Sequence, residues 1–98
     1  MAATLIDTTR VSRTPDQPWC DLGNEVVVLR VQDSTYYRFE DSARAIWLLL
    51  DEPRRVDELT SVLASEYEDA GRSMVGDVTA FLTRCADLGL VSHDATDG

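Results

Sequence analysis

Two short runs of β-branched and aromatic residues predict an antiparallel hairpin in the first half of the chain. The first run covers residues 25–31, a polar turn follows at 32–34, and the second run covers residues 35–39. Side chains alternate between the two faces of a strand, so one face of each run is expected to pack on the core. In the first run, Val27, Leu29 and Val31 are taken to point inward, which turns Arg30 outward. In the second run, Tyr37 and Phe39 share the expected core face, because the other face carries Arg38.

Apolar residues that recur three and four positions apart predict three helices after the hairpin. The first is expected to begin at Asp41 or Ser42, either of which would cap it, and to end just before Pro53. The second covers about residues 55–67, and the third covers residues 73–88 and ends at a glycine. The expected buried positions are Ala43, Ile46, Trp47, Leu50, Val56, Leu59, Val62, Leu63, Tyr67, Met74, Val78, Phe81, Leu82, Cys85 and Leu88.

The two ends of the chain carry weaker patterns. Residues 1–24 are only loosely placed: alternation over residues 5–13 predicts a first strand, two prolines then predict a loop, and Trp19 is expected to cover one end of the core. Leu90-Val91 is expected to form a small strand or to cover the core, and residues 93–98 to form a frayed polar tail. The pattern therefore predicts one domain over residues 1–98 of the α+β class, a winged helix-turn-helix with an N-terminal three-stranded antiparallel sheet followed by three helices.

Composition narrows the classes of partner. The 98 residues carry 18 acidic side chains against nine basic ones, all arginine, for a net charge of −9. Such a surface repels phosphate backbones and anionic membranes and attracts basic partners, although it also serves simple solubility. No apolar run is long enough to span a bilayer, and the first residues lack the pattern of a secretory signal. We therefore expect a cytoplasmic protein that binds neither nucleic acid nor a membrane.

Residues that carry chemistry are scarce. The chain has one histidine, His93, in the expected tail, and two cysteines, Cys20 and Cys85, too few and too far apart for a zinc site. Cys85 lies on the apolar stripe of the third helix and is expected to be a small buried residue. No glycine-rich phosphate loop is present. The sequence therefore predicts a protein that is not an enzyme and that needs no metal or cofactor.

The order and spacing of the core positions resemble those of the PqqD-like family, the recognition elements for precursors of ribosomally synthesised, modified peptides. The resemblance covers residues 25–91 and is closest to the stand-alone leader-binding proteins of lasso-peptide biosynthesis. It rests on Tyr36-Tyr37-Arg38-Phe39, Ala43-x-x-Ile46-Trp47-x-x-Leu50, Val56-Asp57-Glu58-Leu59, Leu63, Asp77-Val78-x-x-Phe81-Leu82 and Leu88-Gly89-Leu90-Val91. The chain departs from the family where Asp33-Ser34 precedes the aromatic strand, since a glycine is common there, and where Phe39-Glu40 replaces Leu-Asn.

The resemblance implies a binding mode. The leader segment of a precursor peptide would add as a strand to the outer edge of the third strand, in a groove whose other wall is the last helix. The partners would be that leader peptide, whose basic residues would meet the acidic surface, and a separate leader protease. The implied peptide-binding residues are Thr35, Tyr36, Tyr37, Arg38 and Phe39 on the strand, and Met74, Asp77, Val78, Phe81 and Arg84 on the helix.

Other interpretations stay open from the residues alone. Met74, Val78 and Phe81 also fit plain core positions, and Tyr36 and Arg38 also fit an ordinary exposed strand face. A carrier for the precursor of pyrroloquinoline quinone has the same fold. A DNA-binding winged helix and a structural subunit of a larger complex are further alternatives, although neither the second nor the third helix has the basic exposed face of a recognition helix.

Overall fold

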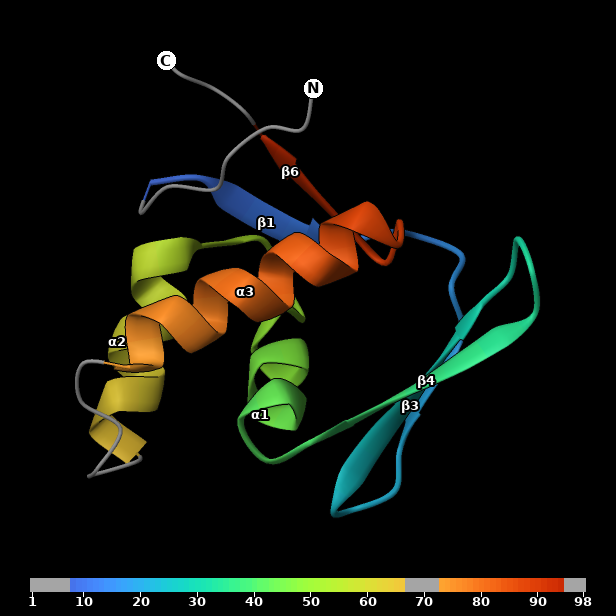
Figure 1. The fold of residues 1–98 in the computed structure, drawn as a ribbon, viewed down its shortest axis with the longest axis horizontal. Helices are drawn as coiled ribbons and strands as arrows, with labels where there is room; N and C mark the ends of the chain where they lie inside the picture. The colour runs from blue at the N-terminus through green and yellow to red at the C-terminus, as the bar shows by residue number, and fades with distance from the viewer. Residues whose placement is uncertain (1–7, 67–72, 95–98) are drawn as a thin grey trace.

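The computed structural model describes residues 8–66 and 73–94, which form two small antiparallel sheets and three helices (Figure 1). In Figure 1 the helices lie below the strands nearest the two ends of the chain, and the hairpin of residues 25–40 projects to the right of them. In chain order the elements are β1 (Arg10–Arg13), β2 (Trp19–Asp21), β3 (Glu25–Arg30), β4 (Thr35–Glu40), α1 (Asp41–Leu49), β5 (Arg54–Arg55), α2 (Val56–Glu66), α3 (Ser73–Asp87) and β6 (Val91–Asp94).

The predicted hairpin is β3 and β4, but β3 faces the core with the opposite set of side chains. Val26 and Val28 are fully buried, whereas Val31 lies beyond the strand and is 52% exposed. Val26 pairs with Phe39 and Val28 with Tyr37, and directly paired residues share a face of the sheet. The expectation for Val27, Leu29 and Val31 was therefore wrong. Every residue from 26 to 29 is apolar, so alternation along β3 alone does not show which face is buried.

The predicted N-terminal three-stranded antiparallel sheet is present, but the position predicted for its first strand was wrong, and a second sheet was not predicted. The sheet that contains the hairpin has the order β2-β3-β4, and its first strand lies at residues 19–21, in the predicted loop. The earlier strand, β1, belongs to a second sheet with the order β5-β1-β6. In that sheet Val11 pairs with His93, so part of the predicted frayed tail is β6, while residues 95–98 lie outside the described residues. Pairing across some eighty residues leaves no local signal in a sequence.

The junction of β4 and α1 has no loop. Glu40 is the last extended residue and the N-cap, and it makes no side-chain capping hydrogen bond. The chain then turns at Asp41, whose φ of 53° lies in the left-handed region. The predicted cap at Asp41 or Ser42 was therefore one or two residues late, because the strand continues up to the first turn of the helix.

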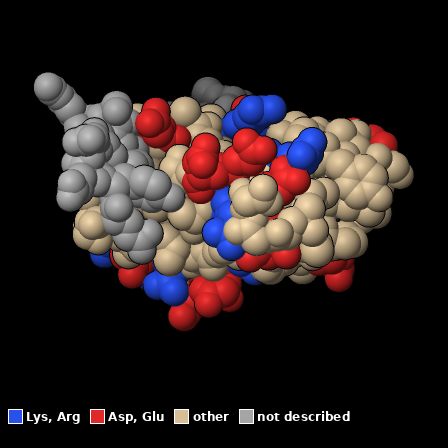
Figure 2. Space-filling view, turned by 90° about the horizontal axis from the view of Figure 1, so that it is seen from below, with Lys and Arg blue, Asp and Glu red and all other residues tan. Residues whose placement is uncertain are grey.

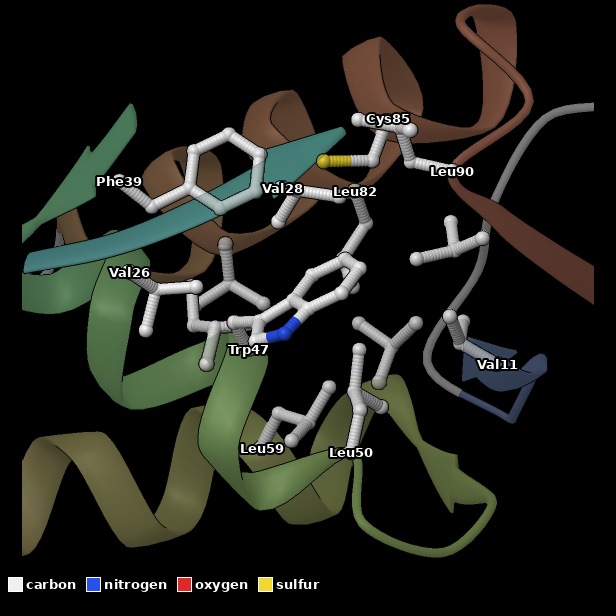
Figure 3. Close-up of a cluster of buried hydrophobic side chains, with 14 of the residues drawn as sticks. Val11, Val26, Val28, Phe39, Trp47, Leu50, Leu59, Leu82, Cys85 and Leu90 are labelled. Atoms are coloured by element: carbon white, nitrogen blue, oxygen red, sulfur yellow. The ribbon is translucent and has the colours of Figure 1, made fainter. Parts of the chain in front are cut away.

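Trp47 of α1 lies at the centre of the core, 1% exposed, between side chains of both sheets and the other helices (Figure 3). Its ring is 5.6 Å from that of Phe39 and 6.2 Å from that of Trp19, which is 39% exposed and covers it at one side. Most predicted helix core positions are buried: Ile46, Trp47, Leu50, Val56, Leu59, Leu63, Val78, Leu82 and Cys85. Ala43, Val62, Phe81 and Leu88 are half-buried, and Tyr67 and the Met74 side chain lie outside the described residues.

None of the helices described has the length and the apolar character that crossing a membrane requires.

Candidate functional site

A groove of about 310 Å³ lies between β4 and α3. β4 is an edge strand of its sheet, so only one of its two edges is hydrogen-bonded to a neighbouring strand. The junction of β4 with α1 contributes Glu40 and Ala43 to the groove. The full lining is Tyr36, Tyr37, Arg38, Phe39, Glu40, Ala43, Phe81, Arg84, Cys85 and Leu88.

The floor of the groove is apolar. Phe39 of β4 and Phe81 of α3 meet edge to face, with ring centroids 4.8 Å apart and an interplanar angle of 87°. Phe81, Cys85 and Leu88 recur at helical spacing, which places them on the same face of α3. Burial raises the pKa of the Cys85 thiol to about 12, so the thiol stays neutral and behaves as an apolar group. The floor can therefore hold apolar rings or aliphatic side chains.

The β4 side of the groove is polar and more exposed. Tyr36 is 67% exposed, which is unusual for a large aromatic side chain. Arg38 donates two hydrogen bonds of 2.9 Å to the carboxylate of Glu25 on β3. These bonds raise the pKa of the Arg38 guanidinium, and the nearby carboxylate of Glu40 adds to the effect. The Arg38 guanidinium is thus already paired with a carboxylate of the neighbouring strand.

The α3 side carries one further charge, Arg84. Its side chain is exposed and lines the groove one helical turn after Phe81. Within the described part of the chain, no carboxylate lies within ion-pair distance of its guanidinium.

The structure brings six of the ten implied binding residues together around this groove: Tyr36, Tyr37, Arg38, Phe39, Phe81 and Arg84. Thr35 is on β4 and Asp77 is exposed on α3, but neither is part of the lining. Val78 is fully buried in the core, so it is no surface of the groove, and the Met74 side chain lies outside the described residues. Two residues of the lining, Cys85 and Leu88, were predicted only as core positions. Their spacing of four and seven residues from Phe81 could have indicated that they face the groove with it.

The residues that line the groove form no recognisable catalytic group. Among the residues that the structure describes, no three histidine, cysteine or acidic side chains gather where a metal ion could bind. His93 is on β6, in the other sheet, paired with Val11. The arrangement is an apolar trough beside an open strand edge, with charged side chains at its rim, which suits an extended chain rather than a reaction.

Two of three comparisons with known proteins found a match. A solved structure described as TbiB1 in complex with the TbiA(beta) leader peptide matches with a TM-score of 0.75 and 26% sequence identity, covering 83% of this chain and 94% of that one. No curated protein matches. The model of the family described as coenzyme PQQ synthesis protein D (PqqD) matches residues 25–91, which is more than half of the chain. The chain therefore belongs to the PqqD family, whose members are non-catalytic peptide-binding chaperones.

Proposed function

We propose that this protein recognises the leader segment of a ribosomally synthesised precursor peptide by adding it as a strand to the open edge of β4. The observation that carries the proposal is the groove itself: an edge strand whose free side faces an apolar trough walled by α3. TbiB1, which shares the fold, was solved in complex with a leader peptide.

Strand addition divides the recognition between main chain and side chains. The free edge of β4 presents backbone N–H and C=O groups that a second extended chain can pair with, whatever its sequence. Alternate side chains of the added strand would face α3 and the floor formed by Phe39 and Phe81. Affinity would therefore come from the backbone, and selectivity from the groove. An exposed edge also invites aggregation, which the leader strand would prevent.

At the finer level we propose a lasso-peptide pathway, in which the protein holds the precursor and presents it to a separate leader protease. Leaders of that class typically carry a tyrosine and a proline three residues later. Both are compact rings with little conformational freedom, and the apolar floor around Phe81, Cys85 and Leu88 suits them. The resemblance of the aromatic strand and the Ala43-x-x-Ile46-Trp47 segment to stand-alone lasso-pathway proteins supports this choice.

The test is a calorimetric titration with a synthetic leader peptide, taken from the precursor gene beside the protein's own gene. A scrambled peptide of the same composition and a duplex DNA serve as controls. We expect saturable binding of the leader alone, lost when its tyrosine or proline is replaced by alanine. Equal binding of the scrambled peptide, or binding of the duplex that falls steeply with salt, would contradict the proposal.

A variant locates the binding site. Tyr36→Ala removes an exposed ring from the groove and is expected to weaken leader binding about tenfold while leaving the fold intact. Leu22→Ala is the matched control, since Leu22 is an exposed apolar residue, 56% accessible, that does not line the groove. Unchanged affinity in Tyr36→Ala, or equal losses in both variants, would place the binding site elsewhere.

A second candidate is the carrier of the pyrroloquinoline quinone precursor, and the description of the matching family model favours it. The fold and the groove serve this function equally. A competition titration separates the two, with the neighbouring leader and a precursor peptide of the quinone pathway as rival ligands. Tighter binding of the quinone precursor would favour the second candidate.

A further inference from the structure

Most of the described arginines form ion pairs with carboxylates of the same chain. Figure 2 shows basic and acidic groups side by side on one face of the molecule. Ion pairs of 2.6–3.3 Å hold Arg30, Arg38, Arg44, Arg54 and Arg55. Arg13 instead donates to the carbonyl oxygen of Trp47, at 2.7 and 3.2 Å. Within the described residues, Arg10 and Arg84 are the two arginines with neither an ion pair nor a side-chain hydrogen bond, and of these only Arg84 lines the groove.

The neighbours of Arg84 leave its guanidinium available. Asp87, three residues further along α3, is spaced for an ion pair with Arg84 but forms none. The one carboxylate among the lining residues is Glu40, whose charge acts on Arg38. Arg38 itself is occupied by Glu25. The lining of the groove therefore contains two guanidinium groups, Arg38 and Arg84, and one carboxylate, Glu40. Of the two guanidinium groups, only that of Arg84 has no ion pair within the described residues.

The local charge of the groove thus differs from that of the whole molecule. A net charge of −9 predicts a basic ligand, whereas the groove has an excess of positive charge at its α3 wall. When a strand fills the groove, water around Arg84 is displaced, and an unpaired guanidinium then loses solvation without compensation. A carboxylate on the incoming chain restores the balance and can accept two parallel hydrogen bonds from the planar guanidinium.

We propose that Arg84 selects an aspartate or glutamate in the bound leader segment. This inference rests on the proposed function and adds the chemistry of one ligand position to it. Arg84 follows Phe81 by three residues, a rise of about 4.5 Å along the helix. Successive same-face residues of a strand are about 6.6 Å apart, within reach of a long arginine side chain. The carboxylate is therefore expected two positions from the leader residue that packs on Phe81.

The test is fluorescence anisotropy with the labelled synthetic leader peptide of the neighbouring precursor gene. Arg84→Gln is expected to raise the Kd about fivefold, and Arg84→Glu more than about tenfold, because reversal adds repulsion. Arg84→Lys keeps the charge but loses the planar fork, so an intermediate loss is expected. Arg10→Glu is the matched control: it makes the same change in net charge at another arginine without a described carboxylate partner, on β1 and outside the groove.

A second set of peptides identifies the partner of Arg84. Each acidic residue of the leader is replaced in turn by its amide, and one replacement is expected to weaken binding to the wild type but not to Arg84→Gln. A leader with lysine at that position is expected to bind Arg84→Glu better than the unmodified leader does. Such a reversal of preference follows only from direct contact between the two side chains.

The outcomes separate this inference from the function on which it rests. If the wild-type protein does not bind the leader, the proposed function fails. If the wild type binds and Arg84→Glu binds equally well, the selection by Arg84 is wrong and strand addition stands. A loss as large in Arg10→Glu would show a general effect of net charge and would also overturn the inference, as would a leader without any acidic residue.

Discussion

Arg13 shows how a single side chain can join three elements. Its guanidinium carbon lies 4.4 Å from the ring centre of Trp19 and 5.3 Å from that of Trp47. It also donates to the Trp47 carbonyl oxygen, near the C-terminal end of α1, where helix carbonyls lack partners within the helix. Burial lowers the pKa of Arg13, partly offset by Asp51, yet arginine stays charged at any ordinary pH. Charge, stacking and hydrogen bonding thus act together.

Replacing Arg13 with methionine is expected to lower the free energy of unfolding by about 1–2 kcal/mol, because two charge-assisted hydrogen bonds and the stacking on Trp19 are lost. Urea unfolding followed by tryptophan fluorescence measures this change. Arg10→Met on the same strand is the control, with an expected change within about 0.5 kcal/mol. Equal effects of the two replacements would show that Arg13 has no special structural role.

The two cysteines are expected to differ in reactivity. Cys20 is exposed, whereas Cys85 is buried and its pKa is raised to about 12. Iodoacetamide at pH 8 should therefore alkylate Cys20 in the folded protein and Cys85 only after unfolding, as mass spectrometry of the peptides would show. Rapid modification of Cys85 in a Cys20→Ser variant that remains folded would contradict the burial of the groove floor.

The same thiol gives a pH dependence of stability with a definite sign. Because its folded pKa of about 12 lies above the ordinary value of 9.0, the native state retains a proton that the unfolded chain loses. Cys85 therefore has no effect below about pH 9 and lowers stability as the pH rises from there toward 12. Relative to Cys85→Ala, the wild type should lose stability over this range in urea titrations, and a constant difference would contradict the assignment.

At the scale of elements, the turn of the hairpin carries a residue in an unfavourable conformation. Ser34 has a φ of 58°, in the left-handed region, immediately before β4. A side chain at such a position costs about 1–2 kcal/mol, which glycine avoids, although glycine loses more entropy on folding. A glycine at this position would adopt the left-handed conformation without that steric cost, so the turn that brings β4 against β3 has a physical reason to favour glycine.

Ser34→Gly is accordingly expected to raise the free energy of unfolding by up to about 1 kcal/mol. Ser34→Val should lower it, because a β-branched side chain tolerates the left-handed region poorly. Thermal unfolding followed by circular dichroism compares the two. Opposite signs are the expected result, whereas equal shifts in one direction would show that backbone conformation does not control this turn.

At the scale of the whole molecule, the open edge of β4 leaves part of the sheet without a partner. A ligand that binds only the folded state stabilises it by mass action, by about 2.7 kcal/mol at a concentration one hundred times its Kd. For a domain of this size that corresponds to a rise in Tm of about 10 °C or more. We expect such a rise with the leader peptide and none with its scrambled form, measured by scanning fluorimetry. A leader that binds without raising the Tm would indicate affinity for the unfolded chain.

The sequence by itself determined the α+β class, three helices with nearly all their buried faces, and the aromatic strand that runs into the first helix. These features depend on residues a few positions apart, so periodicity reports them directly. The sequence also predicted that Tyr36 and Phe81 line the same groove. That prediction came from the resemblance to the family and not from a local pattern.

Only the tertiary structure decided which face of β3 is buried, which strands share a sheet, and which arginines already have partners. Val26 to Leu29 are all apolar, and their facing depends on pairing with β4. β1 pairs with β6 from the far end of the chain, and Arg38 is neutralised by Glu25 from the neighbouring strand. Each is a contact between residues distant in sequence, and a local pattern carries no record of such contacts. The same holds for Arg84: only the fold shows that its guanidinium has no carboxylate partner within the described residues.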